Sequence, residues 1–270
     1  MKPECEKKLD KLRDILKETG GCAVAYSGGV DSSLLLTVAH EVLGDRALGV
    51  IATSSTYPER EFKRAIDLAK GKNFTYVVIN SEELDIDGFS KNPADRCYYC
   101  KKELFDKVRE QAQARELNWI ADGTNADDTG DYRPGMIAAR ELGVLSPLLE
   151  AGLTKDDIRT ILREVYELDI ADKPSMACLA SRFPYGMTIT KNKLAQVEKI
   201  ETYLEALGFR VYRARHHGDI VRLELGAEEL KAAMDVDTRS KIVAVAKEHG
   251  FKYVTLDMEG YRTGSMNEVL

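Results

Sequence analysis

The chain has 270 residues, of which 44% are hydrophobic and 31% charged, a composition that is ordinary for a globular protein of one large or two modest domains. A formal net charge of −6 argues against stable nucleic-acid binding, and no apolar run approaches the roughly 20 residues that span a bilayer. Because residues 1–8 are charged rather than apolar, we expect no secretory signal and a cytoplasmic protein without a membrane partner.

The first half of the chain alternates short apolar runs with helical patterns. An amphipathic helix is predicted over residues 4–18, where Leu9, Leu12 and Leu16 share one face. Apolar runs typical of strands buried on both faces follow at residues 22–26, 47–52, 76–79 and 119–121, with helices predicted at residues 32–43, 59–70 and 101–116. The pattern indicates an α/β fold with a doubly wound parallel sheet, whose ligands bind at the carboxyl ends of the strands.

The second half contains a further strand–helix unit, a long loop and a smaller domain. The unit is expected at residues 144–149, and Thr154 begins a capping box for the next helix. Helical periodicity stops from Asp169 to Met187, and a loop of this length inside a compact domain is usually functional. Beyond it we expect a small α+β domain with a helix through residues 194–207, strands at 209–215, 220–225 and 253–256, and two further helices. We therefore predict two domains, residues 1–187 and 188–270.

The strand at residues 22–26 runs straight into a Gly-rich turn, residues 27–32. Gly28 and Gly29 lack a Cβ, so backbone N–H groups can approach an anion, while Ser27 and Ser32 supply hydroxyl donors beside the positive end of the following helix. The turn lacks the lysine of a Walker A loop and the spacing of a dinucleotide-binding fingerprint. An ordinary βα turn with helix-capping residues is the alternative. In this context SGGVDS resembles the PP-loop of the ATP pyrophosphatase superfamily, whose members split ATP between its α and β phosphates.

Three of the five cysteines stand in a pattern that suits metal binding. Cys97 and Cys100 form a CxxC pair, and Cys178 lies in the long loop. A structural zinc site normally needs four ligands, and no second CxxC pair accompanies this one, whereas three cysteines can hold a 4Fe-4S cluster and leave its fourth iron open to an external sulfide. The alternatives are a dithiol with an unrelated Cys178, or three cysteines without function. Cys5 and Cys22 are expected to be an exposed helix residue and a buried strand residue.

The chain resembles the LarE family over nearly its whole length, in residues 27–33 (SGGVDSS), 95–105 (DRCYYCKKELF), 122–135 (DGTNADDTGDYRPG), 146–159 (SPLLEAGLTKDDIR), 173–186 (KPSMACLASRFPYG) and 256–270 (LDMEGYRTGSMNEVL). LarE-family proteins are ATP-dependent sulfur transferases in the biosynthesis of the nickel-pincer nucleotide, the cofactor of lactate racemase. The resemblance implies that the substrate is pyridinium-3,5-biscarboxylic acid mononucleotide, whose carboxylates are adenylylated and then converted to thiocarboxylates. It also implies a homo-oligomer.

The family contains two ways of supplying sulfur. In one, the cysteine at the position of Cys178 gives up its own sulfur and becomes dehydroalanine, so the protein is consumed. In the other, cysteines at the positions of Cys97, Cys100 and Cys178 hold a 4Fe-4S cluster that carries an extra sulfide from an external source and can turn over. Because all three cysteines are present, we expect the cluster route, with sacrificial donation from Cys178 as the alternative.

Carboxylate activation brings pyrophosphate close to an anionic substrate, so the site needs Mg²⁺ and basic residues. Asp31 and Cys178 are the expected catalytic residues, with Asp31 on the metal or pyrophosphate side. Asp128 is a weaker candidate for a second carboxylate. A helix-capping role explains Asp31 equally well. The residues expected to bind ATP are Ala25, Ser27, Gly28, Gly29, Asp31, Ser32, Ala52 and Gly123. The superfamily resemblance implies that backbone groups near Ala52 and Gly123 hold the adenine. We expect Arg213, Arg215 and Arg182 to bind the substrate's phosphate and carboxylates, and Arg133 is a further candidate. The alternative for each of these arginines is a position on a solvated face.

Two other classes of function compete with the sulfur transferase. A PP-loop ligase would need ammonia, usually from a glutaminase domain for which 270 residues leave no room, and a tRNA-thiolating enzyme would be expected to show a basic face. A non-enzymatic iron–sulfur or nucleotide-sensing protein would bind nucleotide without releasing pyrophosphate.

Overall fold

The computed structural model describes residues 1–270 except for 87, 131–133, 175, 263 and 266–270. The described residues form two compact units. The first contains residues 1–54, 59–81 and 95–176, and the second contains residues 55–58, 82–94 and 177–270. The domain boundary expected near residue 187 lies inside the second unit, and the division into residues 1–187 and 188–270 stays a prediction.

The first unit is built on a parallel sheet with the strand order β3-β2-β1-β4. Its strands are β1 (Cys22–Ala25), β2 (Ala47–Thr53), β3 (Thr75–Asn80) and β4 (Trp119–Ala121). Cys22 is in register with both Ala47 of β2 and Trp119 of β4, so the carboxyl ends of the three strands meet at one edge. The predicted parallel sheet is confirmed. The expectation of strands buried on both faces is wrong for β3, because this edge strand leaves Val78 41% exposed.

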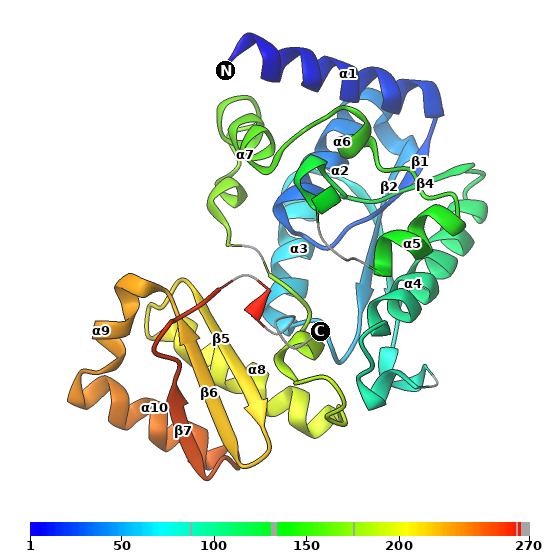
Figure 1. Cartoon of the computed structure of the whole chain (residues 1–270). Coiled ribbons are helices and arrows are strands. Elements are labelled where there is room, and N and C mark those ends of the chain that lie inside the picture. The colour runs from blue at the N-terminus through cyan, green and yellow to red at the C-terminus, as the bar shows by residue number, and fades with distance from the viewer. Residues whose placement is uncertain (87, 131–133, 175, 263, 266–270) are drawn as a thin grey trace. The chain divides into compact units, whose positions relative to one another are not determined.

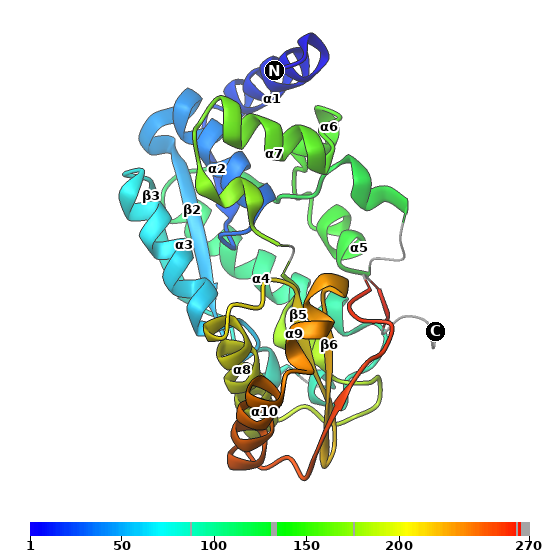
Figure 2. The same cartoon turned by 90° about the vertical axis from the view of Figure 1, so that its left-hand side faces the viewer.

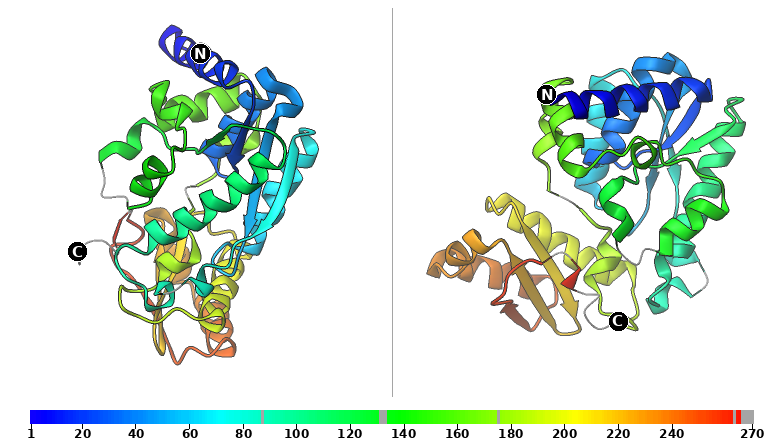
Figure 3. Two further views of the ribbon diagram at one scale, coloured as in Figure 1. Left: turned by 90° about the vertical axis from the view of Figure 1, so that its right-hand side faces the viewer. Right: turned by 45° about the horizontal axis from the view of Figure 1, so that its top comes forward.

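Helices cover both faces of this sheet, as Figures 1 and 2 show. One face packs against α1 (Pro3–Thr19), α2 (Val30–Leu43), α3 (Glu59–Gly71), α6 (Pro147–Glu150) and α7 (Lys155–Glu164). The other face packs against α4 (Arg96–Gln113) and α5 (Pro134–Glu141), which lie side by side (Figure 3). This arrangement is the doubly wound fold that the sequence predicts. The expected strand at residues 144–149 is reduced to a parallel bridge between Ala121 and Leu145 ahead of α6.

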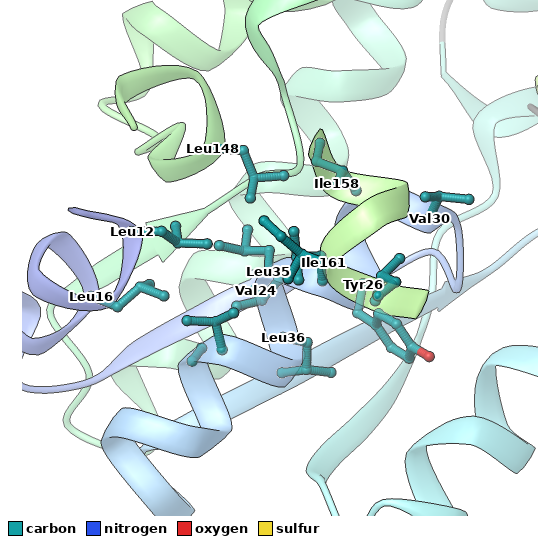
Figure 4. Close-up of a cluster of buried hydrophobic side chains, with 14 of the residues drawn as sticks. Leu12, Leu16, Val24, Tyr26, Val30, Leu35, Leu36, Leu148, Ile158 and Ile161 are labelled. Atoms are coloured by element: carbon teal, nitrogen blue, oxygen red, sulfur yellow. The ribbon is translucent and has the colours of Figure 1, made fainter. Parts of the chain in front are cut away.

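The larger core of the first unit lies between the sheet and helices α1, α2 and α7 (Figure 4). Along α1 the buried positions are Cys5, Leu9, Leu12 and Leu16, whose spacing places them on one helical face. The expectation that Cys5 is exposed is therefore wrong, because it extends this apolar stripe and is only 4% exposed. Helix α2 is buried on nearly every side, as its apolar sequence predicts, so the turn before it leads into a helix that is fixed by packing.

Helix α7 begins with the predicted capping box. Thr154 Oγ1 accepts a hydrogen bond from Asp157 N at 3.2 Å, and the Asp157 carboxylate accepts one from Thr154 N at 3.1 Å. Lys8 of α1 pairs with the same carboxylate at 2.7 Å. The cap therefore determines where α7 starts and places Lys155, its first residue.

The second unit has a mixed sheet with the order β5-β6-β7, in which β5 and β6 are antiparallel and β6 and β7 parallel. Helices α8 and α10 lie side by side against this sheet (Figure 1). Its elements are α8 (Lys191–Ala206), β5 (Tyr212–His217), β6 (Ile220–Leu225), α9 (Leu230–Ala233), α10 (Val236–Glu248) and β7 (Tyr253–Leu256). The expected small α+β fold is confirmed. No helix in the described parts of either unit is both long and apolar enough to cross a membrane.

Two short segments from the first half of the chain join the second unit, which the sequence does not predict. Leu179 N–H donates to the Thr56 carbonyl at 2.8 Å, and Ile189 N–H donates to the Ser90 carbonyl at 2.8 Å. Asn92 is fully buried, and its side-chain amide donates to the carbonyl of Phe183 at 3.1 Å. Residues 55–58 and 82–94 therefore hold the chain on both sides of the short 3₁₀ helix η6 (Leu179–Arg182).

Candidate functional site

The Gly-rich turn joins β1 to α2 at the carboxyl edge of the sheet and is cross-linked by its own hydroxyl groups. Ser27 N–H donates to Ser32 Oγ at 3.2 Å, and the two serine hydroxyl oxygens lie 3.1 Å apart. Ser32 O–H in turn donates to the Gly29 carbonyl at 3.3 Å. The structure thus brings Ser27 and Ser32 together beside the first turn of α2, where hydroxyl and backbone donors can face one anion.

Gly28 and Gly29 have different roles in this turn. Gly28 has φ +59°, and a Cβ on it would lie 2.6 Å from the Cβ of Ala65 in α3. The Tyr26 hydroxyl donates to the Ala65 carbonyl at 3.3 Å, so α3 is held against the turn. Gly29 is extended, with φ −81°, and is the N-cap residue of α2. The N–H groups of the first helical turn therefore point toward the turn, where the helix dipole favours an anion.

Asp31 lies in the first turn of α2, but its carboxylate is bonded to other elements. Lys155 Nζ lies 2.6 Å from Asp31 Oδ1, and Asn125 Nδ2 donates to the same oxygen at 3.1 Å. Lys155 belongs to α7, and Asn125 immediately precedes the 3₁₀ helix η4 (Ala126–Gly130). The Asp31 side chain remains 25% exposed, so the carboxylate is oriented by two donors and still accessible. This arrangement suits a carboxylate that binds a cation better than one that only caps its helix.

The other residues expected to bind ATP lie at the carboxyl ends of neighbouring strands. Ala25 ends β1, Ala52 lies close to the end of β2, and Gly123 follows β4. A Cβ on Gly123 would lie 3.0 Å from Ser32 N, so the absence of a side chain lets the chain after β4 pass close to the start of α2. Backbone groups of β1, β2 and β4 therefore surround the Gly-rich turn.

Sequence reasoning missed three polar side chains around this turn, namely Asn125, Lys155 and Lys173. Lys173 Nζ donates to the Gly28 carbonyl at 2.8 Å. All three lie in segments that carry the LarE resemblance, but no spacing rule shows that they face the turn. The weaker candidate Asp128 accepts a hydrogen bond from Asn125 N at 3.0 Å and so stabilises the local η4 turn.

The three candidate cysteines are divided between the two units. Cys97 and Cys100 lie at the start of α4 in the first unit, three residues apart, so their side chains lie on the same side of the helix. Cys178 immediately precedes η6 in the second unit. Cys97 and Cys178 are exposed and Cys100 is half-buried. Within the described residues, no set of three or more Cys, His, Asp or Glu side chains is arranged to hold a metal ion.

Arg182 is fully buried and bonded to protein groups. Its Nε and Nη2 donate to the two carboxylate oxygens of Glu201 at 2.7 and 3.0 Å. Its Nη1 donates to the carbonyls of Ala177 at 2.9 Å and Cys178 at 3.2 Å. Burial lowers the pKa of Arg182, but the negative charge of Glu201 outweighs this and raises it, so the guanidinium stays charged. Arg182 therefore holds the backbone at Cys178, and its expected contact with substrate stays a prediction.

Arg213 and Arg215 lie on β5 in the same polar cluster. Arg215 donates to the Glu224 carboxylate at 2.7 and 3.0 Å, and to the Ser181 carbonyl at 2.8 Å. The Arg213 guanidinium lies 4.8 Å from the centroid of the Tyr261 ring. Burial, reinforced by the positive charge of Arg182, lowers the pKa of Arg213. The negative charge of Glu201 opposes both effects. Arg133 lies outside the described residues.

Comparisons with known proteins agree with this geometry. A family model described as NAD synthase matches residues 4–121, which include the Gly-rich turn. An uncharacterized protein of Synechocystis is 39% identical over 265 residues, which cover 98% of both chains. A pyridinium-3,5-bisthiocarboxylic acid mononucleotide synthase of Lactiplantibacillus plantarum is 36% identical over 256 residues, 94% of this chain and 92% of that protein. One component of a glutamine-hydrolyzing GMP synthase of Thermoplasma volcanium is 28% identical over 169 residues, 58% of this chain and 54% of that protein.

Replacing Gly28 with Ala tests how closely α3 confines the turn. Gly20 is the matched control, because it has φ +62° but no atom within 4 Å of an added Cβ. We expect Gly20→Ala to lower the free energy of unfolding by about 1 kcal/mol through backbone strain alone. Gly28→Ala should lower it by roughly 1–3 kcal/mol more, because the added methyl group overlaps Ala65. Urea denaturation measures both values, and equal losses would contradict the close contact with α3.

Replacing Arg182 with Met tests the buried ion pair. The change leaves the Glu201 carboxylate without its main partner inside the protein, so we expect a loss of about 3–5 kcal/mol in the free energy of unfolding. Arg163→Met is the control, because Arg163 pairs with Asp172 on the surface and its removal should change stability little. Chemical denaturation of the two variants compares them, and losses of similar size would show that the Arg182 pair is not structural.

Proposed function

This chain belongs to the LarE family, and from this premise we propose that it is an ATP-dependent sulfur transferase acting on pyridinium-3,5-biscarboxylic acid mononucleotide. The proposal is carried by the near end-to-end likeness to the Lactiplantibacillus plantarum synthase. A Gly-rich turn built for an anion, with an oriented carboxylate beside it, supports it from the structure. The cytoplasmic location and the homo-oligomer stay predictions.

The proposed reaction has two steps at each carboxylate. A substrate carboxylate oxygen attacks the α-phosphorus of ATP, the bond to the bridging oxygen breaks and pyrophosphate leaves, so an acyl adenylate forms. Sulfide then attacks the acyl carbon, and the C–O bond breaks to release AMP and leave a thiocarboxylate. The first step needs donors that stabilise the growing charge on pyrophosphate, and the second needs a sulfur nucleophile close to the adenylate.

The residues around the Gly-rich turn fit the first step. The hydroxyls of Ser27 and Ser32 and the N–H groups at the start of α2 would bind the phosphates of ATP. Asp31, oriented by Asn125 and Lys155, would hold Mg²⁺ as a carboxylate ligand, and this ion would neutralise charge on the leaving pyrophosphate. Backbone groups near Ala52 and Gly123 would hold the adenine.

The arginine cluster of the second unit fits an anionic substrate. Arg213 would bind the phosphate or carboxylates of the pyridinium mononucleotide, since guanidinium groups bind both in bidentate fashion. Arg215 already makes a bidentate pair with Glu224, so it would add positive charge beside the substrate anion. Arg213 is buried, and a substrate anion beside it would offset the cost of burying its charge. Arg182 would hold the carbonyl of Cys178, and its own contact with the substrate stays a prediction.

The three cysteines fit a cluster by their chemistry. Thiolates are the ligands of 4Fe-4S clusters, and Cys97 and Cys100 present two of them from one side of α4, near the helix N-terminus, where negative charge is favoured. Cys178 is exposed and its backbone is held by Arg182. When bound, the cluster would supply an open iron position for sulfide from an external source. Sacrificial loss of sulfur from Cys178 is the alternative route to the same product.

Ligases and tRNA-thiolating enzymes with PP-loops are the competing class. The likeness to the GMP synthase component of Thermoplasma volcanium covers 58% of this chain, whereas the likeness to the Lactiplantibacillus plantarum synthase covers 94%. The additional coverage favours the sulfur transferase over an amidating ligase.

The sulfur-transfer proposal predicts a substrate-dependent split of ATP. We expect the protein with ATP, Mg²⁺, sulfide and pyridinium-3,5-biscarboxylic acid mononucleotide to release AMP and pyrophosphate and to form the thiocarboxylate, detected by mass spectrometry. A pyridinium mononucleotide without carboxylates is the control, because it offers no group to adenylylate. A protein that binds ATP but releases no pyrophosphate with the full substrate would instead support a nucleotide sensor.

The cluster route predicts bound iron. Protein purified without oxygen should contain about four irons per chain, and Cys97→Ser and Cys178→Ser should each lose most of them. Cys5→Ala is the control, because Cys5 is buried against α7 and should not affect iron content. Metal analysis and the electronic spectrum measure this. An iron-free protein that still forms the thiocarboxylate, with dehydroalanine at Cys178, would establish the sacrificial route.

A further inference from the structure

Lys173 makes two contacts at the Gly-rich turn that none of the roles above uses. Its Nζ donates to the Gly28 carbonyl at 2.8 Å and forms an ion pair with Glu61 of α3. The side chains of Lys173 and Glu61 are only 13% and 4% exposed. A largely buried ammonium group is thus held against one backbone oxygen of the turn.

The backbone of Lys173 is fixed as well as its side chain. Lys173 N–H donates to the Ile170 carbonyl at 3.0 Å, at the end of the 3₁₀ helix η5 (Asp169–Asp172). The Lys173 carbonyl accepts a hydrogen bond from Arg159 Nη2 of α7 at 2.8 Å. Arg159 also donates to the Ala171 carbonyl. Because both ends of the residue are anchored, its ammonium group can act as a fixed support for the turn.

The contact with the Gly28 carbonyl determines the direction of the next N–H group. In a trans peptide the C=O and N–H bonds point in opposite directions. The carbonyl of Gly28 points toward Lys173, so the N–H of Gly29 points the opposite way. A peptide between two glycines has little steric preference and can rotate at small cost. Without a partner for the carbonyl, the Gly29 N–H would be free to turn away.

From these contacts we propose that Lys173 is a positioning residue, which holds the Gly28–Gly29 peptide so that the Gly29 N–H faces the phosphates of ATP. The inference rests on the proposed function, because it takes ATP as the ligand of the turn. Lys173 acts through the backbone and does not touch the nucleotide. Glu61 keeps the ammonium group in place and balances its charge, so the lysine contributes little net charge to the site.

The test compares two ligands in the full-length protein. Isothermal titration calorimetry measures the affinities of ATP and adenosine for the native protein, for Lys173→Met and for Lys72→Met. Lys72 lies on the surface after α3 and controls for the loss of one positive charge. We expect Lys173→Met to bind ATP at least tenfold more weakly and adenosine with unchanged affinity, because adenosine has no phosphate. Lys72→Met should match the native protein for both ligands.

Glu61→Gln distinguishes positioning from direct phosphate binding and keeps the proposal testable if Lys173→Met does not fold. Positioning predicts weaker ATP binding in this variant too, because the ammonium group loses the carboxylate that holds it beside Gly28. A lysine that binds phosphate itself would bind ATP more tightly once that competing carboxylate is removed, which would overturn the proposal. Unchanged ATP affinity in Lys173→Met, or equal losses for ATP and adenosine, would also overturn it. A native protein that binds no ATP would overturn the proposed function as well.

Discussion

The close contact between Gly28 and Ala65 is the constraint on which the rest of the site depends. Helix α3 approaches the turn so closely that no side chain fits at Gly28, and the Tyr26 hydroxyl bonds to the same helix. The same helix supplies Glu61, the partner of Lys173. The conformation of the turn is therefore set by its contacts with α3 and Lys173 before any ligand binds, which would lower the entropy lost on binding the proposed phosphate.

The second unit is stabilised differently, because a buried ion pair holds the backbone at Ala177 and Cys178. A buried ion pair such as Arg182–Glu201 is seldom more stabilising than well-packed apolar side chains of similar size. The ion pair here has a different effect, which is to fix the orientation of nearby backbone groups. Arg182 donates to Glu201 and also to the carbonyls of Ala177 and Cys178, so a single side chain orients the backbone at Cys178.

Local patterns in the sequence were enough to predict the sheet, most helices and the Gly-rich turn, because apolar runs, the Thr154 capping box and the glycine pair act over a few residues. The same kind of pattern places Cys5 on the buried face of α1, four residues before Leu9, so the expectation that it is exposed missed a local signal. The partner of Arg182, Glu201, lies on a separate helix, so their ion pair becomes visible only in three dimensions. Lys173 was missed for the same reason, since both its partners are distant in the chain.

The second unit is assembled from three separated pieces of chain, and this has consequences for how the protein folds. Asn92 donates a hydrogen bond to Phe183, 91 residues away. Such a contact forms only after the chain between the two residues has brought them together. Such long-range closure is slow compared with the formation of a helix. A C-terminal fragment made alone would lack residues 55–58 and 82–94 and leave buried polar groups around η6 unsatisfied. The region that carries Cys178 is therefore expected to become ordered late, and only in a chain that is already complete on its N-terminal side.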